Sequence, residues 1–368
     1  MDVIVLAPHP TFPIGNFKKK KTIISKKFDN GVTLLNFYTI TPKNEQIKFL
    51  ERVGYYLIFS IFASWWLIIN NKKYEIVMSS SPPLFTFIPG YISKLIFHKK
   101  YVLDIRDYWV EGAIEMGFVK RKSFVSFLSK FLEKIAYKKS DLIFTTTQAL
   151  KNEINKKYYL NKNKTIWIPN GVDTDEFKPS EIEINRIIYA GNIGTVQDLQ
   201  LVILAIKSLK EYGINMKLTL VGGGDSTEEL KFFIKQENLT DSIEFLGVKN
   251  REDTSKLISE SMMGVAPVKK MNSTNYIIPT KIYEYMGCGI PFIACGGDEI
   301  KSIVKKSEAG LFSNNTVGDI TENILKLYNN KGMRVEMGNN GRKYVEKYFQ
   351  RKYIIQKIIK AIRGLNNE

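Results

Sequence analysis

The segment Ile168-Pro169-Asn170-Gly171-Val172-Asp173, followed by Phe177-Lys178-Pro179, divides the sequence into two halves of similar character. The apolar run 166–169 closes a first block, and Asn170 with Gly171 predicts a turn because both residues adopt positive φ at little cost. We therefore place a domain boundary between residues 170 and 183. A chain of 368 residues also exceeds what one hydrophobic core usually organises, which favours two domains.

Short β-branched apolar runs alternate with longer amphipathic segments on both sides of this boundary. The alternation predicts an α/β fold in which two Rossmann-like domains, each a parallel sheet flanked by helices, face a cleft. Ligands of such sheets bind at the carboxyl ends of the strands. The expected domains are 1–172 and 173–345, with a closing C-terminal helix at 346–368. The expected strands are 3–7, 32–38, 76–79, 101–105, 142–146, 186–190, 217–221, 243–246, 264–267, 291–294 and 310–312. The expected helices lie at about 46–70, 84–97, 121–138, 148–157, 197–212, 226–238, 251–261, 280–288 and 317–330, with one or two closing helices over 333–363.

Positive charge is concentrated in the first half. The net charge is +17, and residues 1–170 contain 27 Lys and Arg against 12 Asp and Glu, whereas the remainder has 27 against 25. A basic half attracts polyanions, and we favour the anionic cytoplasmic leaflet of a membrane, with Lys18–Lys21, Lys26 and Lys27 as candidate contacts. Solvated lysine-rich faces are the alternative. No nucleic-acid-binding module accompanies the charge, so nucleic acid is not an expected partner.

The uncharged stretch 53–69 is shorter than the roughly 20 residues that a membrane-spanning helix needs. We expect a buried or interface-lying helix, with a single-pass anchor as the alternative. The chain contains two cysteines, Cys288 and Cys295, which favours a reducing, cytoplasmic setting, and no secretion signal opens it. Two distant histidines, His9 and His98, without a compact acidic cluster argue against a dedicated metal site.

Two glycine-rich turns end neighbouring strands of the second half. Glycine lets the backbone approach a phosphate closely, and the helix that follows offers unpaired N–H groups with a partial positive charge. Two such turns at one edge of a single sheet favour a bound ligand, although chain geometry alone would also select glycine. The candidate ligand contacts are Gly191, Asn192, Gly194, Gly222 and Gly224.

The segment Pro279-Thr280-Lys281-Ile282-Tyr283-Glu284-Tyr285-Met286-Gly287-Cys288-Gly289 adds charged groups to this edge. Thr280 is the expected N-cap of a helix that Gly287 or Gly289 ends. Lys281 places a cation where anions already bind, and Glu284, one turn after Thr280, can accept two hydrogen bonds from a ribose diol. A plain surface carboxylate is the alternative for Glu284, but the apolar residues around it indicate a partly buried helix.

A charged and aromatic cluster follows the fourth strand expected in the first half. Asp107 and Glu111 can bind hydroxyl groups while Trp109 covers the apolar face of a sugar ring. These three are therefore candidate sugar-binding residues. Asp104 and Arg106 could instead form a structural ion pair.

Together these segments resemble retaining glycosyltransferase family 4, which has the GT-B architecture. The resemblance is greatest to the bacterial and archaeal branch that builds surface polysaccharides and lipid-linked glycans. Residues 168–173 resemble that family's interdomain signature, 189–194 its nucleotide-phosphate loop and 279–289 its donor-binding helix. Residues 107–117 resemble an acceptor-domain segment of this branch. The resemblance covers essentially the whole chain.

The resemblance implies a hexosyltransferase that moves a sugar from a nucleoside diphosphate sugar to a lipid-linked or polysaccharide acceptor with retention of configuration. Glu284 would bind the ribose. The departing diphosphate would take the acceptor proton, so that its stabilisation by backbone N–H groups and Lys281 needs neither a metal nor another cofactor. Asp107 and Lys281 are the candidate catalytic residues. The enzyme would be cytoplasmic and peripheral on the inner face of the cell membrane. The residues expected around the diphosphate are Gly191, Asn192, Gly194, Thr280 and Lys281.

Three features depart from the family pattern. Family members commonly carry a Glu eight residues before the ribose-binding Glu, and Tyr276 occupies that position. The Arg and Lys expected after the glycine loop are absent from 196–198. The first strand resembles the family's second, so the first β-α unit, roughly 30 residues, is expected to be missing from the N-terminal domain or encoded upstream. An epimerase of nucleotide sugars and a non-catalytic scaffold of the same fold are the alternative functions, and scarce histidine argues against the epimerase.

Overall fold

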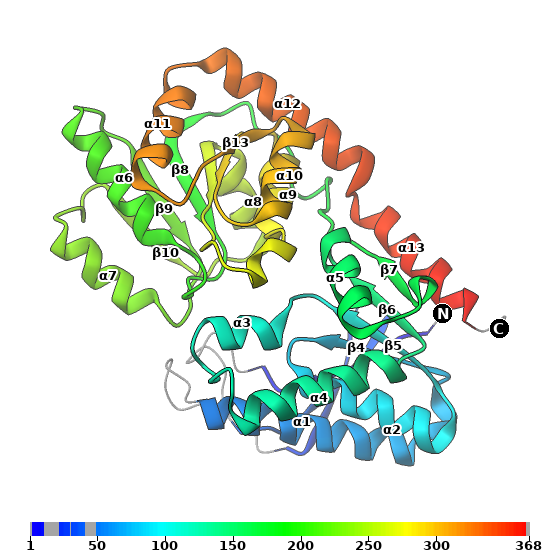
Figure 1. Cartoon of the computed structure of the whole chain (residues 1–368). Helices are drawn as coiled ribbons and strands as arrows, with labels where there is room; N and C mark the ends of the chain where they lie inside the picture. The colour runs from blue at the N-terminus through cyan, green and yellow to red at the C-terminus, as the bar shows by residue number, and fades with distance from the viewer. Residues whose placement is uncertain (1, 11–21, 30, 41–48, 366–368) are drawn as a thin grey trace. The chain divides into compact units, whose positions relative to one another are not determined.

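The computed structural model describes residues 2–10, 22–29, 31–40 and 49–365. The chain divides into two compact units, Met1–Trp167 and Ile168–Glu368, which we call the first and second units (Figure 1). Both units combine parallel strands with helices, so the α/β class predicted from the sequence is confirmed. The Lys18–Lys21 cluster lies outside the described residues.

The first unit contains two sheets. One has the order β1-β3-β2, with β1 parallel and β2 antiparallel to β3, and the other is parallel with the order β4-β5-β6-β7. β2 is not among the expected strands, because Lys26 and Lys27 interrupt its apolar pattern at an exposed sheet edge. The strands are β1 Ile4–Pro8, β2 Ile24–Asp29, β3 Val32–Phe37, β4 Ile76–Ser81, β5 Lys100–Ile105, β6 Leu142–Thr145 and β7 Thr165–Trp167.

The uncharged stretch 53–69 lies in helix α1, Phe49–Ile69. Its residues Phe59 and Ala63 pack into a core with Leu35 and Phe37 of β3. In the described part of the chain no helix is both long and apolar enough to cross a membrane. The other helices of this unit are α2 Phe87–Phe97, α3 Trp109–Glu115, α4 Phe124–Lys139 and α5 Gln148–Tyr158, with 3-10 turns η1 Asn71–Lys73, η2 Leu84–Thr86 and η3 Lys162–Lys164.

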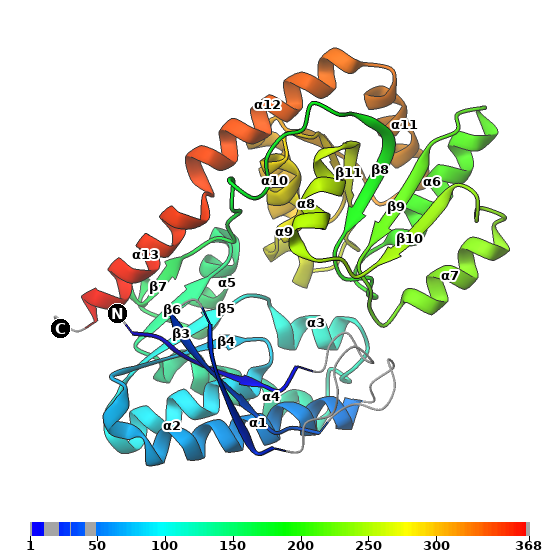
Figure 2. The same ribbon diagram turned by 180° about the vertical axis from the view of Figure 1, so that it is seen from behind.

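The second unit is built on one six-stranded parallel sheet with the order β10-β9-β8-β11-β12-β13 (Figure 2). Numbered from its first strand, this is 3-2-1-4-5-6, the Rossmann order. The direction of winding reverses between β8 and β11, and ligands of such sheets bind beside the carboxyl ends of the strands at that switch point. The strands are β8 Ile184–Ala190, β9 Lys217–Val221, β10 Ile243–Gly247, β11 Ser261–Ala266, β12 Phe292–Ala294 and β13 Gly310–Phe312.

Helices cover this sheet with apolar stripes at helical spacing. In α6, Leu199–Glu211, the buried residues include Val202, Ile206 and Leu209, which join a core with the strands. α10 is absent from the elements expected above. The remaining elements are α7 Thr227–Gln236, α8 Arg251–Ser259, η4 Ser273–Tyr276, α9 Thr280–Gly287, α10 Asp298–Ser307, α11 Val317–Tyr328, α12 Lys331–Tyr348 and α13 Arg351–Gly364.

The expectation for Asn170 and Gly171 is wrong in its physical basis. Neither residue has a positive φ. A Cβ atom on Gly171 would lie 2.6 Å from the Ile354 side chain and 2.9 Å from the backbone oxygen of Phe349. Glycine is therefore needed here because the backbone passes close to the start of α13, not because the chain turns sharply.

Candidate functional site

Tyr285 of α9 marks the switch point of the second unit. Its hydroxyl lies between the two strands where the winding reverses, 3.0 Å from the carbonyl oxygen of Val265 and 3.3 Å from that of Ile188. The backbone N–H of Ala190 donates to the same hydroxyl. The ring fills space left by Gly264, where a Cβ atom would come within 2.6 Å. Tyr285 thus fixes α9 over β8 and β11.

α9 begins one residue earlier than a Thr280 cap requires. Pro279 is the cap position, Thr280 is the first helical residue, and no side chain caps the helix. The prediction that Thr280 caps it is therefore wrong: Thr280 already lies inside the helix, and the carbonyl of Pro279 accepts a hydrogen bond of 3.1 Å from the N–H of Ile282. Thr280 is exposed. Gly287 is the last helical residue, as one of the two expected alternatives.

Lys281 extends from α9 along the first glycine turn. Its side chain is 7% exposed, and Nζ lies 4.8 Å from the centre of the Tyr189 ring. A Cβ atom on Gly191 would lie 3.2 Å from Lys281 Cε, so the side chain passes directly beside this turn. Burial lowers the Lys281 pKa to about 8, and the charge of Glu284 opposes that shift. Within the described residues no hydrogen bond or ion pair joins its ammonium group to another side chain.

Glu284 lies one helical turn after Lys281 and is half-buried. Burial raises its pKa, and the charges of Lys281, Arg251 and Arg351, in decreasing order, oppose the rise. Its carboxylate, like the Lys281 ammonium, makes no hydrogen bond or ion pair with a residue that the structure describes. Perturbed, unpaired ionisable groups at the binding edge of a sheet are typical of functional sites.

The two glycine turns interlock. The N–H of Gly191 donates to Val221 over 2.9 Å and the N–H of Ile193 donates to Gly223 over 3.1 Å. Gly222 has a φ of +128°, and a Cβ atom there would lie 1.9 Å from the carbonyl oxygen of Gly191. The alternative reading, that chain geometry selects glycine, therefore accounts for Gly222 by itself. Donor contacts from Gly191, Asn192, Gly194, Gly222 and Gly224 remain predictions.

Val196, one of the positions that depart from the family pattern, is hydrogen-bonded to the segment after β11. The Val196 carbonyl accepts a hydrogen bond of 2.9 Å from the N–H of Lys269, which follows β11. Lys269 and Lys270 therefore bring cations to the loop in which the expected Arg and Lys are absent. Tyr276 is half-buried at the end of η4. The sequence analysis did not single out Lys269, which lies shortly after the end of β11.

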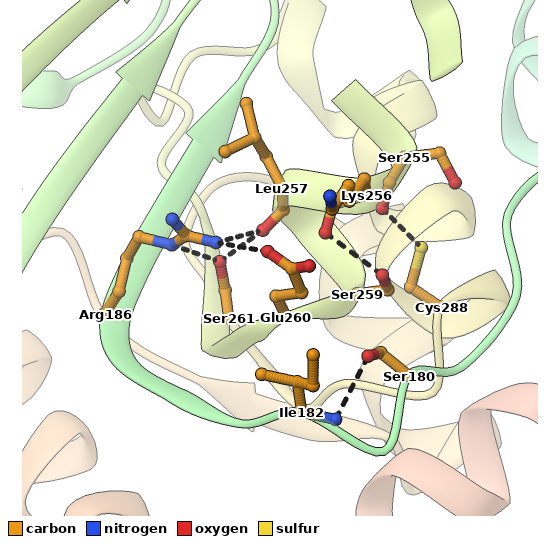
Figure 3. Close-up of polar contacts among 10 residues, drawn as sticks. All are labelled: Ser180, Ile182, Arg186, Ser255, Lys256, Leu257, Ser259, Glu260, Ser261 and Cys288. Atoms are coloured by element: carbon orange, nitrogen blue, oxygen red, sulfur yellow. Dashed lines mark hydrogen bonds and ion pairs between the residues drawn. The ribbon is translucent and has the colours of Figure 1, made fainter. Parts of the chain in front are cut away.

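Polar contacts hold α8 against the sheet, as Figure 3 shows. Arg186, near the start of β8, donates from Nε to Ser261 Oγ over 2.9 Å and from Nη2 to the Leu257 carbonyl over 2.8 Å. Cys288, directly after α9, lies with Sγ 3.7 Å from the Ser255 carbonyl. Burial raises the Cys288 pKa to about 12, so this thiol is a packing group. These contacts position α8, whose first residue is Arg251, beside α9 and Glu284.

The candidates in the first unit differ in their surroundings. Asp107 is exposed and Trp109 is the half-buried first residue of α3. Glu111 is engaged by Arg121, 2.9 Å away, and by Lys130, 3.8 Å away. A carboxylate held by two cations has a structural role already, and the acceptor roles of all three residues remain predictions.

Asp104 belongs to the structure of this unit. It is buried and accepts hydrogen bonds from Ser80 over 3.0 Å and from Arg106 over 3.3 Å. The structural ion pair considered for Asp104 and Arg106 is thus confirmed. Among the residues described in both units, no group of three or more His, Cys, Asp or Glu side chains could hold a metal ion.

A Rossmann-ordered sheet with an unpaired cation and carboxylate at its switch point, preceded by a second α/β unit, defines the class of protein. Solved structures agree on the fold. Sucrose-phosphate synthase from Thermosynechococcus elongatus matches with a TM-score of 0.75 and 16% identity over 94% of this chain and 86% of that one. Anabaena Alr3699/HepE, solved in complex with UDP-glucose, matches with a TM-score of 0.69 and 14% identity over 90% and 86%. The chain has the GT-B fold.

Family models identify the chain further. Residues 3–176 match the model described as Glycosyltransferase Family 4, and residues 173–344 match Glycosyl transferases group 1. The protein is thus a glycosyltransferase, and its first half matches the Family 4 model.

Relatives of this chain are also named as sugar transferases. An uncharacterised glycosyltransferase of Methanocaldococcus jannaschii, MJ1178, is 27% identical over 66% of this chain and 64% of its own length, a little under two thirds. The capsular polysaccharide biosynthesis glycosyltransferase CapM of Staphylococcus aureus is 23% identical over 79% and 77%. An N-acetylgalactosamine-N,N'-diacetylbacillosaminyl-diphospho-undecaprenol 4-alpha-N-acetylgalactosaminyltransferase of Campylobacter jejuni is 23% identical over 64% and 60%.

Proposed function

We propose that this protein transfers a sugar from a nucleoside diphosphate sugar to a lipid-linked or polysaccharide acceptor, with retention of configuration. The observation that carries the proposal is the pair Lys281 and Glu284, one turn apart on α9 at the switch point. Their burial shifts both pKa values toward the neutral forms, and neither group has a polar partner among the described side chains. A buried ionic group costs free energy until a complementary ligand offsets that cost.

The two groups suit opposite parts of one donor. Lys281, beside the Gly191 turn, complements a diphosphate, and the exposed Asn192 and Thr280 border the same place. Glu284 can accept two hydrogen bonds from a ribose diol. In this reaction the departing diphosphate takes the proton of the acceptor hydroxyl, so no protein nucleophile is required. The catalytic task of Lys281 is to stabilise the charge that develops on the leaving group, without a metal.

The relatives support the class of substrate. HepE was solved with UDP-glucose, and the Campylobacter enzyme is named for a diphospho-undecaprenol acceptor. In the present chain, the donor domain would comprise 173–345 with the closing helix 346–368, and the acceptor domain 1–172. Asp107 and Trp109 are the proposed acceptor contacts, while Glu111 supports that segment through Arg121. The basic first half would attach this cytoplasmic enzyme peripherally to the membrane that bears the acceptor.

The experiment is to incubate the full-length protein with a panel of nucleotide sugars and to measure slow release of nucleotide. Glu284→Ala is expected to lower kcat/KM about 100-fold, because two hydrogen bonds to a charged group are lost. Glu284→Gln keeps the shape of the side chain, and its kcat/KM should lie between those of the wild type and Glu284→Ala. Glu322→Ala, an exposed carboxylate on α11, is the matched control and should leave the rate unchanged.

Three outcomes would reject the proposal. Nucleotide release that is insensitive to Glu284→Ala removes the site from the reaction. Conversion of the donor sugar without release of nucleotide identifies an epimerase. Saturable binding of nucleotide sugar without turnover of any donor or acceptor identifies the scaffold alternative, which Tyr276 and the missing Arg and Lys motivated.

A further inference from the structure

Helix α4, Phe124–Lys139, presents three phenylalanines outward while it buries a glutamate and a serine. An ordinary surface helix does the opposite. Its buried residues include two polar ones and are Ser126, Glu133, Ala136 and Tyr137. The outward residues recur at i, i+3, i+4 and i+7, a single helical face. They are Phe124, Phe127, Leu128 and Phe131, which are 76%, 69%, 40% and 51% exposed.

Buried polar contacts fix this orientation of α4. Glu133 is 2% exposed and accepts hydrogen bonds from Tyr137 over 3.1 Å and from Tyr158 of α5. Ser123 caps the helix by accepting from the N–H of Ser126 over 3.2 Å. If α4 rotated to bury its phenylalanines, Glu133 would leave the interior and lose its hydrogen bonds to Tyr137 and Tyr158. The outward aromatic face is therefore a property of the fold.

Cations surround the aromatic face. Residues 120–139 contain seven Lys and Arg, and their one acidic residue is the buried Glu133. The exposed cations lie just before the helix and along its second half. Isolated exposed apolar residues need no explanation, but four on one face, rimmed by one sign of charge, do. The exposed cations are Lys120, Arg121, Lys122, Lys134, Lys138 and Lys139.

An anionic bilayer complements both features at once. Aromatic and aliphatic side chains of an interfacial helix enter the boundary between headgroups and acyl chains, while the basic residues meet anionic headgroups. α1 and α2 lie along the same side of the first unit as α4 in both views, and α2 packs against both (Figures 1 and 2). α1 also carries exposed apolar side chains, among them Ile61 and Trp65.

We propose that the Phe124–Phe131 face of α4, with Lys120 and Lys122, inserts into the headgroup region of an anionic membrane. This inference rests on the proposed function in one respect, namely that the acceptor is linked to a lipid. Binding to the membrane itself requires no catalysis. The face would hold the enzyme on the surface in which a lipid-linked acceptor is embedded.

The test uses the full chain and sedimentation with vesicles of phosphatidylcholine, alone or mixed with phosphatidylglycerol. Wild-type protein should bind the anionic vesicles preferentially. Phe124→Ser with Phe127→Ser should weaken binding on the order of 100-fold, since each phenylalanine buries apolar surface. Lys120→Glu with Lys122→Glu should weaken it at least about fivefold per cation lost. The matched control is Phe232→Ser, which removes an equally exposed phenylalanine, 62%, from α7 of the second unit and should change nothing.

A depth measurement gives a second readout. Phe127→Trp should show a blue-shifted emission on anionic vesicles and quenching by brominated lipid chains. Unchanged sedimentation of the Phe124→Ser, Phe127→Ser protein, or a wild-type protein that ignores anionic vesicles, would overturn the proposal. The proposal would also be overturned if the wild type self-associates and the double variant is monomeric but binds vesicles as the wild type does. The wild type and the Phe124→Ser, Phe127→Ser variant should release nucleotide from a soluble donor at the same rate. A failure of the membrane proposal can therefore be told apart from a failure of the proposed function.

Discussion

Replacing Lys281 with methionine should stabilise the second unit while it impairs the reaction. Burial lowers the pKa of this lysine from its ordinary value of 10.5 to about 8. One pKa unit corresponds to about 1.4 kcal/mol, so keeping the ammonium charged at neutral pH costs on the order of 3 kcal/mol. Methionine has a similar length and no charge to desolvate. Loss of the cation near Glu284 offsets part of the gain.

Unfolding by heat and by urea measures the effect. The second unit has about 200 residues, and 3 kcal/mol would raise its melting temperature by at most roughly 6–12 °C. The pH dependence has a definite sign. Because the folded pKa lies below the unfolded one, the cost is complete below pH 8 and disappears as the pH rises toward 10.5. The gap between variant and wild type should therefore narrow over that range.

The informative quantity is the difference in stability between Lys281→Met and the wild type, because the buried thiols change the stability of both proteins equally. The pKa of Cys288 and of Cys295 is raised to about 12, which lowers the stability of either protein as the pH rises above 9. Adding Glu284→Gln to Lys281→Met removes the offset from Glu284. A variant no more stable than wild type at pH 7, or a gap that persists at pH 10, would refute the desolvation argument. Unchanged nucleotide release would refute the contact between Lys281 and the diphosphate.

Three further predictions concern the same site. Wild-type kcat/KM should fall above pH 8 as Lys281 loses its proton, and Lys281→Arg should remove that fall because arginine stays charged; a retained descending limb would assign it to another group. Gly222→Ala should cost more than about 3 kcal/mol in urea unfolding because its Cβ would meet the Gly191 carbonyl, whereas Gly318→Ala, with no atom within 4 Å, should cost nothing; equal losses would contradict the interlock. Tyr285→Phe should cost about 1–3 kcal/mol by leaving strand groups unpaired, and a neutral result would show that this hydroxyl does not anchor α9.

Much of the fold follows from hydrophobic patterning. Strands β9, β11 and β12 of the second unit are almost entirely buried and mostly apolar, a pattern that predicts a covered parallel sheet. The miss at α10 had a signal, since Ile300, Ile303 and Val304 have helical spacing and are buried. β2 had little signal, because pairing with β3, rather than its own exposed lysines, makes it a strand.

The site was predictable where its residues are adjacent in sequence. Lys281 and Glu284 share a helix face by their spacing alone. The influence of Arg351 on Glu284 depends on where the chain returns after a long separation, which local patterns do not contain. The need for glycine at 171 likewise comes from α13, and the sequence shows only that the residue is glycine.

The interlocked glycine turns restrict how the proposed donor site can change during evolution. Because Cβ atoms on Gly222 and Gly224 would meet the carbonyl oxygens of Gly191 and Ile193, a substitution at either glycine displaces the first turn, along which Lys281 lies. The loop after β11, with Lys269, and the turn η4, with Tyr276, lie outside that interlock. Under the proposed function, selection for a different sugar would act on those segments while the two turns stay as they are, so that substrate choice and nucleotide anchoring would vary independently within one sheet.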